Sequence, residues 1–141
     1  RFLLALKACF SNAQQGGETL IFDEIDAGVS GKVAQAIAEK LHQLSQKHQV
    51  LCVTHQPLIA AMADTHFRVE KEAIEELPLF ANGNGDLPEL RTVVRVTALE
   101  NHRTRREELA QLTGGHSAEE AIAFAESILS KAKAHRQRNL R

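Results

Sequence analysis

One short stretch organises the fold: residues 19–31 read TLIFDEIDAGVSG. It opens with a continuous apolar run, Thr19-Leu20-Ile21-Phe22, and two carboxylates, Asp23 and Glu24, follow at once. An unbroken apolar run of this length is typical of a strand buried on both faces of a parallel sheet. The stretch therefore predicts a buried parallel strand that carries two acids at its carboxyl end.

A helix and a second strand are expected next. Ser30 is the predicted N-cap of the helix, and an apolar stripe follows it. The stripe consists of Val33, Ile37, Leu41 and Leu44. Val50–Thr54 forms the second buried strand, with His55 at its carboxyl end. This order predicts a right-handed βαβ unit, and ligands of such sheets bind beyond the carboxyl ends of the strands. The acids and His55 are therefore expected at the same edge.

Helices and strands alternate along the rest of the chain. Before the first strand, we expect a helix over Arg1–Phe10 and a polar loop up to Glu18. The elements expected after His55 are a helix over Leu58–Ala63, strands over His66–Lys71 and Thr92–Ala98, a helix over Glu107–Leu112, and a last helix to about Ala134 that begins at a capping box of Ser117 and Glu120. The two strands are expected to pair as an antiparallel edge.

Composition places the chain among ordinary globular domains. Of its 141 residues, 43% are hydrophobic and 25% are charged, and the formal net charge is −1. These values exclude a disordered or collagen-like chain, and the near-zero net charge gives no global basic field for nucleic acid. No apolar run approaches the ~18 residues of a membrane span. Cys9 and Cys52 lie far apart in apolar stretches, which argues against a disulfide framework. Since the one methionine is Met62, we expect the sequence to be part of a longer protein.

The acid pair suits phosphate chemistry. Asp23 can complete the shell of a Mg²⁺ ion bound to phosphates, and Glu24 can orient or deprotonate an attacking water. Alone the pair is a weak signal, because many parallel strands end in acids that face solvent or cap the next helix. The loop Asp26–Gly31 strengthens it with a short acid, glycines able to adopt positive φ and a hydroxyl, a combination that suits contact with phosphates or a partner subunit.

His55 has two interpretations. A histidine after a strand is more often a surface or capping residue than a catalytic one. The βαβ geometry, however, brings it to the crevice of Glu24, where an imidazole can donate to a phosphate oxygen or hold the water. The other histidines lack such a setting, and we expect them to be surface or core residues.

These motifs resemble a known family. Leu20–Gly31 followed by Val53-Thr54-His55 is similar to the Walker B, D-loop and switch-histidine series of ABC-type ATPases. More narrowly, the sequence resembles the RecN family of SMC-like bacterial DNA repair ATPases. The segments Val33–Leu41 and Leu109–Gly115 share this resemblance, which covers nearly the whole chain and is weakest over Ala73–Leu90.

The resemblance implies a role for each candidate residue. Asp23 would hold Mg²⁺ through water, Glu24 would act on the hydrolytic water and His55 would sense the γ-phosphate. Within the D-loop, three further positions would lie against the nucleotide at the interface of two ATPase heads. These positions are Asp26, Gly28 and Ser30.

The resemblance also implies an architecture. Residues 1–141 would form the C-terminal lobe of an ABC/SMC-type P-loop ATPase head, an α/β fold with a mainly parallel sheet, flanking helices and a small antiparallel edge. Its parts would be a helix and loop over 1–18, the Walker B, D-loop and switch-histidine βαβ unit over 19–64, and late strands and C-terminal helices over 65–141. The sequence has no G-x-x-x-x-G-K-[ST] motif and no signature motif. The phosphate cradle is therefore expected from an N-terminal half of the head, and this chain alone is expected neither to bind nor to hydrolyse ATP.

The implied function is ATP hydrolysis, with ATP and Mg²⁺ as cofactors, in DNA double-strand-break repair and recombination. Expected partners are the N-terminal half of the same head, a second head in an ATP-sandwiched homodimer and double-stranded DNA ends. The expected location is the bacterial cytoplasm and nucleoid, and no membrane partner is expected. Two alternatives stay open: a fragment of an ABC transporter nucleotide-binding domain and a nonenzymatic α/β domain. The basic end Lys131–Arg141 suits either DNA phosphates or the helix dipole, and we favour the dipole.

Overall fold

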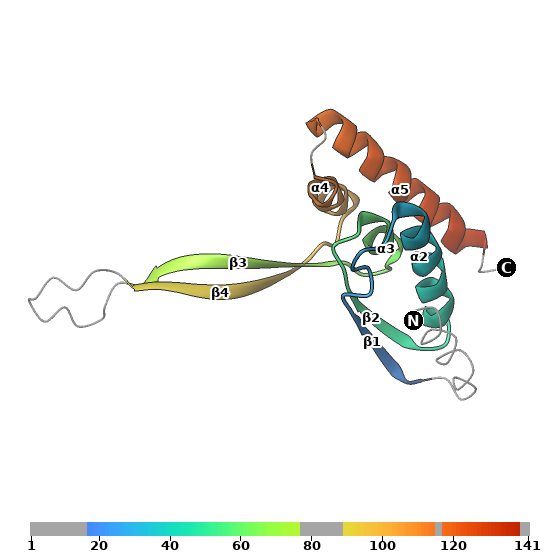
Figure 1. The fold of residues 1–141 in the computed structure, drawn as a ribbon, viewed down its shortest axis with the longest axis horizontal. Coiled ribbons are helices and arrows are strands. Elements are labelled where there is room, and N and C mark those ends of the chain that lie inside the picture. Colours follow the sequence, from blue (N-terminus) through green and yellow to red (C-terminus); the bar gives the residue numbers. More distant parts are fainter. Residues whose placement is uncertain (1–16, 77–88, 115–116, 139–141) are drawn as a thin grey trace, which may run out of the picture. The chain divides into compact units, whose positions relative to one another are not determined.

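A computed structural model describes residues 17–76, 89–114 and 117–138. The predicted helix over Arg1–Phe10 lies outside the described residues. The elements, labelled in Figure 1, are β1 (Thr19–Asp23), α2 (Gly31–Ser45), β2 (Gln49–Val53), α3 (Pro57–Met62), β3 (Phe67–Glu76), β4 (Glu89–Ala98), α4 (His102–Leu112) and α5 (Ala118–Arg138). The chain is thus an α/β protein, as the sequence predicts. Its described residues form two compact units, one up to Asp64 and from Asn101 onward, the other over Thr65–Glu100.

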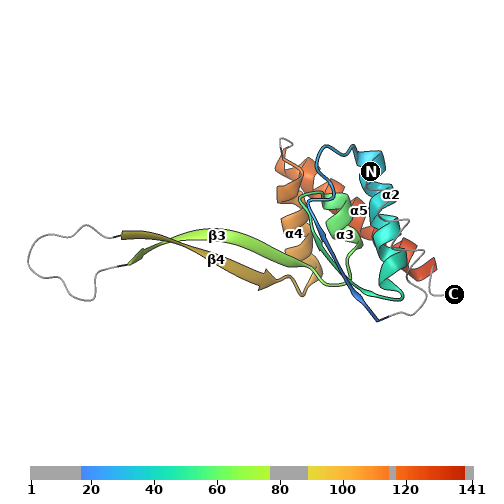
Figure 2. The same ribbon diagram turned by 60° about the horizontal axis from the view of Figure 1, so that its bottom comes forward.

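The first unit contains the predicted βαβ arrangement. Strands β1 and β2 pair in parallel, with Thr19 opposite Gln49 and Asp23 opposite Val53, and α2 connects them. Figure 2 shows α2 and α3 beside this pair of strands, and α3 in turn contacts α4 and α5. The carboxyl ends of the two strands therefore lie side by side, which is the condition the predicted site requires.

Helix α2 packs with a face slightly different from the predicted one. Ile37, Leu41 and Leu44 are buried as expected, but Val33 is 43% exposed and Ala34 takes its place in the core. Ser30 occupies the N-cap position in an extended conformation, yet its side chain makes no capping hydrogen bond there. The helix therefore begins where the sequence predicts, while its packing face is set by the neighbouring helices.

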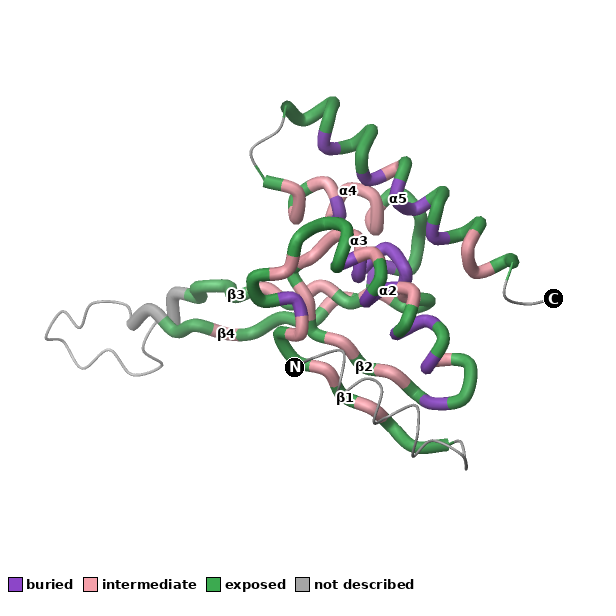
Figure 3. Tube along the Cα trace, turned by 45° about the vertical axis from the view of Figure 1, so that its right-hand side comes forward, coloured by how far each residue is buried: buried purple, intermediate pink, exposed green. Residues whose placement is uncertain are grey.

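The core of this unit lies among the helices, as the buried positions in Figure 3 show. Helices α2, α3 and α5 each contribute several small or aliphatic side chains, and α4 contributes Leu109. These buried residues are Ala34, Ile37, Ala38, Leu41, Ile59, Ala60, Ala61, Met62, Leu109, Ala125, Ile128, Leu129 and Ala132. The sheet adds Phe22, Val50 and Cys52, which pack partly buried against this cluster. Burial of this apolar surface is the main favourable contribution to folding of the unit.

The prediction that both strands are buried on both faces is wrong for this structure. Burial alternates along β1 and β2, and Ile21, Leu51 and Val53 are 70%, 48% and 60% exposed. Successive side chains of a strand point to opposite faces, and the helical core covers one of them. The continuous apolar run therefore leaves an uncovered apolar face in the described part of the chain.

The second unit is the antiparallel pair β3–β4. The pairing is as predicted, with Val69 opposite Val96, but both strands are longer than expected. One face carries most of the exposed apolar side chains, and the other carries ion pairs together with the exposed Ile74. The apolar face includes Phe67, Val69, Val94 and Val96. The ion pairs are Arg68–Glu70 and Arg95–Glu72. Among the described residues, this pair forms a sheet of its own and not an edge of the parallel sheet.

The last two helices begin at side-chain caps. Asn101 accepts a hydrogen bond from the amide of Thr104 at 2.9 Å, which starts α4 five residues before the predicted Glu107. Ser117 accepts from the amide of Glu120 at 3.3 Å, as the predicted capping box requires. Within the part of the chain that the structure describes, none of the helices combines the length and apolarity that a membrane crossing requires.

Candidate functional site

Two carboxylates stand at the carboxyl end of β1. Asp23 is the last residue of the strand, Glu24 follows it, and both side chains are exposed. Glu24 has a φ of 48°, in the left-handed region that non-glycine residues rarely adopt. Such a conformation costs about 1 kcal/mol, and residues of this kind cluster at functional sites. The backbone strain at Glu24 is a structural sign of function that sequence patterns do not reveal.

Two consecutive turns shape the loop after Glu24. The amide of Ala27 donates to the carbonyl of Glu24 at 3.3 Å, and the amide of Val29 donates to the carbonyl of Asp26 at 3.1 Å. Gly28 is the third residue of the second turn and has a φ of 72°, a position where glycine is favoured. These turns fold the chain back on itself, so Asp26 points inward while Gly28 and the Ser30 side chain stay exposed.

His55 meets this loop from the neighbouring strand. It lies two residues beyond the end of β2, and its imidazole is 67% exposed. Its Nδ1 atom lies 3.3 Å from Oδ2 of Asp26, which makes an ion pair when the ring is protonated. Of the predicted site residues, the structure thus brings Asp26 and His55 into direct contact.

Asp26 is the centre of the contacts between the two loops. Its side chain is fully buried, and Oδ2 accepts from the Thr54 hydroxyl and from the amides of His55 and Gln56, each amide at 3.1 Å. Burial by itself raises the pKa of Asp26, but the hydrogen bonds from Thr54 and from backbone amides, with the nearby His55, hold it below the ordinary value. Asp26 is therefore a carboxylate at neutral pH.

The other oxygen of this carboxylate has a different environment. Oδ1 of Asp26 is buried and has no hydrogen-bond partner among the described residues.

Sequence reasoning missed Thr54 as a contributor to the site. Its hydroxyl donates to Asp26 and accepts from the amide of Gln56 at 3.0 Å. A threonine at the end of a strand is common, so its sequence position carries no signal of this role. Only the parallel pairing of β1 with β2 brings it to Asp26.

The relatives of this sequence share one printed name. The chain is 64% identical over 138 residues to the DNA repair protein RecN of Synechocystis sp., which covers 97% of this chain and 24% of the relative. It is 60% identical over 72 residues to RecN of Bacillus subtilis, covering 51% of this chain and 12% of that protein. It is 37% identical over 114 residues to RecN of Xylella fastidiosa (strain Temecula1), covering 80% of this chain and 18% of that protein. The chain belongs to the RecN family.

The match to the RecN family concerns part of a longer protein. The chain spans about a quarter of the length of the Synechocystis relative. No protein-family model matches the chain. These three relatives are named as DNA repair proteins, and none of them is named as an ABC transporter.

Cys52 lies on β2, the strand that leads to His55. Burial, together with the Asp26 and Asp23 carboxylates, raises the pKa of Cys52 to about 11. The residue is thus a protonated thiol at neutral pH, and it packs partly buried against the core as a small apolar side chain.

The acidic end of β1 is an incomplete metal site by itself. Among the described residues, no three histidine, cysteine or acidic side chains gather closely enough to hold a metal ion. A Mg²⁺ ion, however, keeps several waters and takes one or two protein carboxylates together with substrate phosphates. The exposed Asp23 carboxylate fits that requirement, and the other ligands would have to come from water and a bound phosphate.

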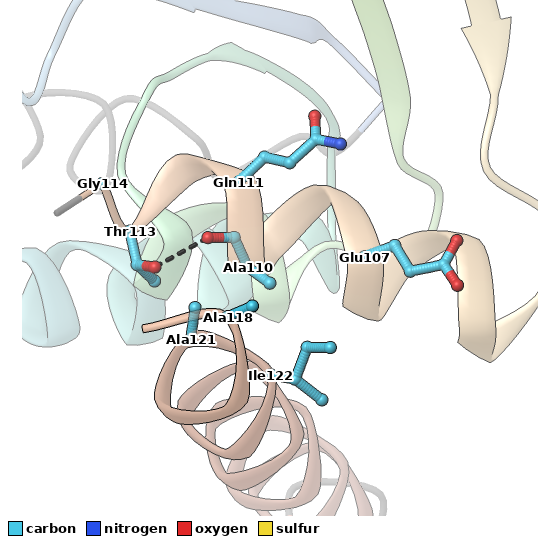
Figure 4. Close-up of a pocket in the computed structure, with 8 residues that line it drawn as sticks. All are labelled: Glu107, Ala110, Gln111, Thr113, Gly114, Ala118, Ala121 and Ile122. Carbon is cyan, nitrogen blue, oxygen red and sulfur yellow. Dashed lines mark hydrogen bonds between the residues drawn. The ribbon is translucent and has the colours of Figure 1, made fainter. Parts of the chain in front are cut away.

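A separate pocket of about 430 Å³ lies where the end of α4 meets the start of α5. Figure 4 shows that small and apolar side chains line it, with Glu107 and Gln111 as its longer polar ones. None of the candidate site residues lines this pocket. It is therefore a packing gap between two helices, distinct from the loops that follow β1 and β2.

Proposed function

We propose that this chain is part of an ATP-hydrolysing, SMC-like RecN protein that acts in DNA double-strand-break repair and recombination. One observation carries the proposal: an exposed acid pair and an exposed histidine end two adjacent parallel strands, and the Asp26 carboxylate connects their loops. The printed name of the relatives, DNA repair protein RecN, supports the repair role.

Each residue of the site has a role in the proposed reaction. Asp23 would hold Mg²⁺ through water, with the metal neutralising phosphate charge. Glu24 would orient the attacking water and accept its proton. The exposed ring of His55 would contact the γ-phosphate. Gly28 and Ser30, exposed on the loop, would lie against the nucleotide where two heads meet, together with the backbone of Asp26.

The remainder of RecN would supply the phosphate cradle. The sequence of this chain has no Walker A motif, whose backbone amides and lysine bind the phosphates of P-loop enzymes. The proposed partners are therefore the N-terminal half of the same head, a second head in a homodimer that encloses ATP, and double-stranded DNA ends bound by the whole protein.

The substitution Glu24→Gln in a full-length RecN that carries this sequence tests the proposal. We expect kcat for ATP hydrolysis to fall about 100-fold or more, because the amide cannot accept the proton of the water. ATP binding is expected to persist, and the ATP-bound heads should accumulate as dimers in size-exclusion chromatography.

The matched control is Glu120→Gln, an exposed glutamate of α5 outside the site. It is expected to retain the wild-type kcat. The assay includes linear and circular double-stranded DNA, and linear DNA is expected to stimulate the wild-type protein more strongly. Wild-type turnover by the Glu24→Gln protein would contradict the catalytic role of Glu24, while equal stimulation by both DNA forms would contradict the role of DNA ends.

A further inference from the structure

The position of Asp26 differs from that of the other proposed site residues. Asp23, Glu24 and His55 are exposed, whereas the Asp26 side chain is completely buried. A buried carboxylate cannot contact nucleotide at the surface of the loop. Its contacts instead run to the loop that follows β2.

These contacts fix both the backbone and the ring of one residue. Oδ2 of Asp26 lies 3.1 Å from the amide nitrogen of His55 and 3.3 Å from its Nδ1. The neighbouring amide of Gln56 and the Thr54 hydroxyl donate to the same oxygen. The negative charge of the Asp26 carboxylate thus lies beside Nδ1 of the ring, while the same oxygen accepts a hydrogen bond from the backbone of His55.

Asp26 also belongs to the loop that begins at Glu24. Asp26 lies two positions after Glu24, and the turn closed by the Ala27 amide on the Glu24 carbonyl includes both residues. Through Asp26, the loop that carries the acid pair and the loop that carries His55 thus form one hydrogen-bonded unit.

We propose that Asp26 is a positioning residue, whose buried carboxylate holds the backbone and imidazole of His55 in a fixed place relative to the loop of Glu24. The buried side chain does not itself contact the nucleotide or the attacking water, and it acts through His55. The inference rests on the proposed ATPase function for its catalytic consequence, whereas the link between the loops stands on the contacts alone.

Two measurements on full-length RecN test the inference. Hydrogen exchange, followed by mass spectrometry without nucleotide, reports the amides of His55 and Gln56. Steady-state kinetics reports kcat and KM for ATP. The variants are Asp26→Ala and Asp26→Asn, and the control is Asp64→Asn, whose side chain is 70% exposed and outside the site.

For Asp26→Ala, we expect the amide of His55 to exchange about tenfold faster, because it loses its acceptor. The amide of Gln56 should also exchange faster, but by less, because the Thr54 hydroxyl remains as a second acceptor. The value of kcat should fall about tenfold or more while KM for ATP changes little, since small displacements of a catalytic group are costly to the reaction. In Asp26→Asn, the side-chain oxygen can still accept from the amides but the charge opposite Nδ1 is lost. Slow exchange with an intermediate kcat is therefore expected for this variant, and Asp64→Asn should match the wild type.

Three outcomes would overturn the inference or separate it from the proposed function. Wild-type exchange at His55 and Gln56 in Asp26→Ala, or a kcat within about twofold of wild type, overturns it. If Asp26→Ala unfolds and exchanges throughout α2 and α5, the variant Thr54→Val decides, because it removes only one hydrogen-bond donor to Asp26. Faster exchange at His55 and Gln56 with a lower kcat would then support the inference. No change in either quantity would overturn it. If Glu24→Gln retains full activity while Asp26→Ala still frees the two amides, the ATPase proposal fails and the link between the loops stands.

Discussion

His42 is a buried imidazole in the last turn of α2. Its side chain is 6% exposed, Nε2 has no hydrogen-bond partner among the described residues, and its ring packs edge-on against His135 with centroids 5.8 Å apart. Burial lowers the pKa of His42, Asp64 opposes this effect, and the positive potential of His135 and Arg136 reinforces it. The folded chain therefore prefers His42 in its neutral form.

This environment predicts a pH-dependent stability. The pKa of His42 is lower in the folded chain than the ordinary value of about 6.5 expected after unfolding, so the unfolded state binds more protons as pH falls. Its contribution to stability is complete above that value and is lost as pH decreases below it. We expect urea titrations to give a smaller free energy of unfolding at pH 5.5 than at pH 7.5.

The variant His42→Leu should weaken this dependence between the two pH values. The control Gln43→Leu places the same residue at an exposed, non-titrating position of the same helix and should retain the wild-type slope. A slope in His42→Leu equal to that of the wild type would show that other groups cause the dependence.

Helix α3 depends on two arginines from other helices. Nη1 of Arg136 in α5 donates to the carbonyls of Ala61, Met62 and Ala63, the last two at 3.1 Å. Nη2 of Arg105 in α4 donates to Ala63 at 2.7 Å, and burial together with the charge of Arg136 lowers the pKa of Arg105. The carbonyls at the end of a helix lack intrahelical partners, so these guanidinium groups take their place. Arg136 thus has a structural contact with the end of another helix, α3, which was not predicted from the sequence.

Removal of the Arg136 guanidinium should therefore destabilise the first unit. Arg136→Met keeps the aliphatic stem and leaves the α3 carbonyls without this donor, which is expected to cost about 1–3 kcal/mol in the free energy of unfolding. Lys131→Met is the matched control, because Lys131 is exposed on the same helix. Chemical denaturation followed by circular dichroism measures the free energy of unfolding of both variants. Equal values for Arg136→Met and Lys131→Met would contradict the capping role of Arg136.

At the scale of the whole molecule, the residues that the structure describes expose apolar side chains on one sheet face of each unit. In the first unit this face contains Ile21, Leu51 and Val53, and in the second it contains Phe67 and Val96. Two-stranded hairpins are marginally stable alone, and contiguous exposed apolar surface marks sites of association. The chain spans about a quarter of the length of the Synechocystis relative, and we propose that further segments of a RecN protein cover such faces.

Mixing this chain with the rest of a RecN protein tests whether the two parts complete one ATPase site. This chain alone is expected to show no ATP turnover, because its sequence lacks the Walker A motif. Mixed with the rest of the same RecN, it should restore turnover in a coupled phosphate-release assay, and a chain carrying Glu24→Gln should not. Turnover by the isolated chain would contradict the proposed division of the site.

Much of the fold follows from local patterns. The apolar run before Asp23 and the stripe of α2 predict β1 and α2, because strands and helices are selected by period and by nearby caps. The start of α4 was missed because its first turn, from His102, is polar and only the cap at Asn101 marks it. The position of the candidate site, at the carboxyl ends of β1 and β2, follows from the predicted βαβ unit, because its parallel strands end at the same edge of the sheet.

By itself, the sequence determined the order of the elements, the antiparallel pairing of β3 with β4, and the candidate residues Asp23, Glu24 and His55. Tertiary structure alone decided that Ile21 is exposed and that the Asp26 carboxylate is buried against the loop of His55. The physical reason is the range of the interactions. Hydrogen bonding within a helix or strand, and the period of its apolar residues, depend on neighbours along the chain. The burial of a side chain, and the contacts of the Asp26 carboxylate with the loop of His55, depend on residues that only folding brings together.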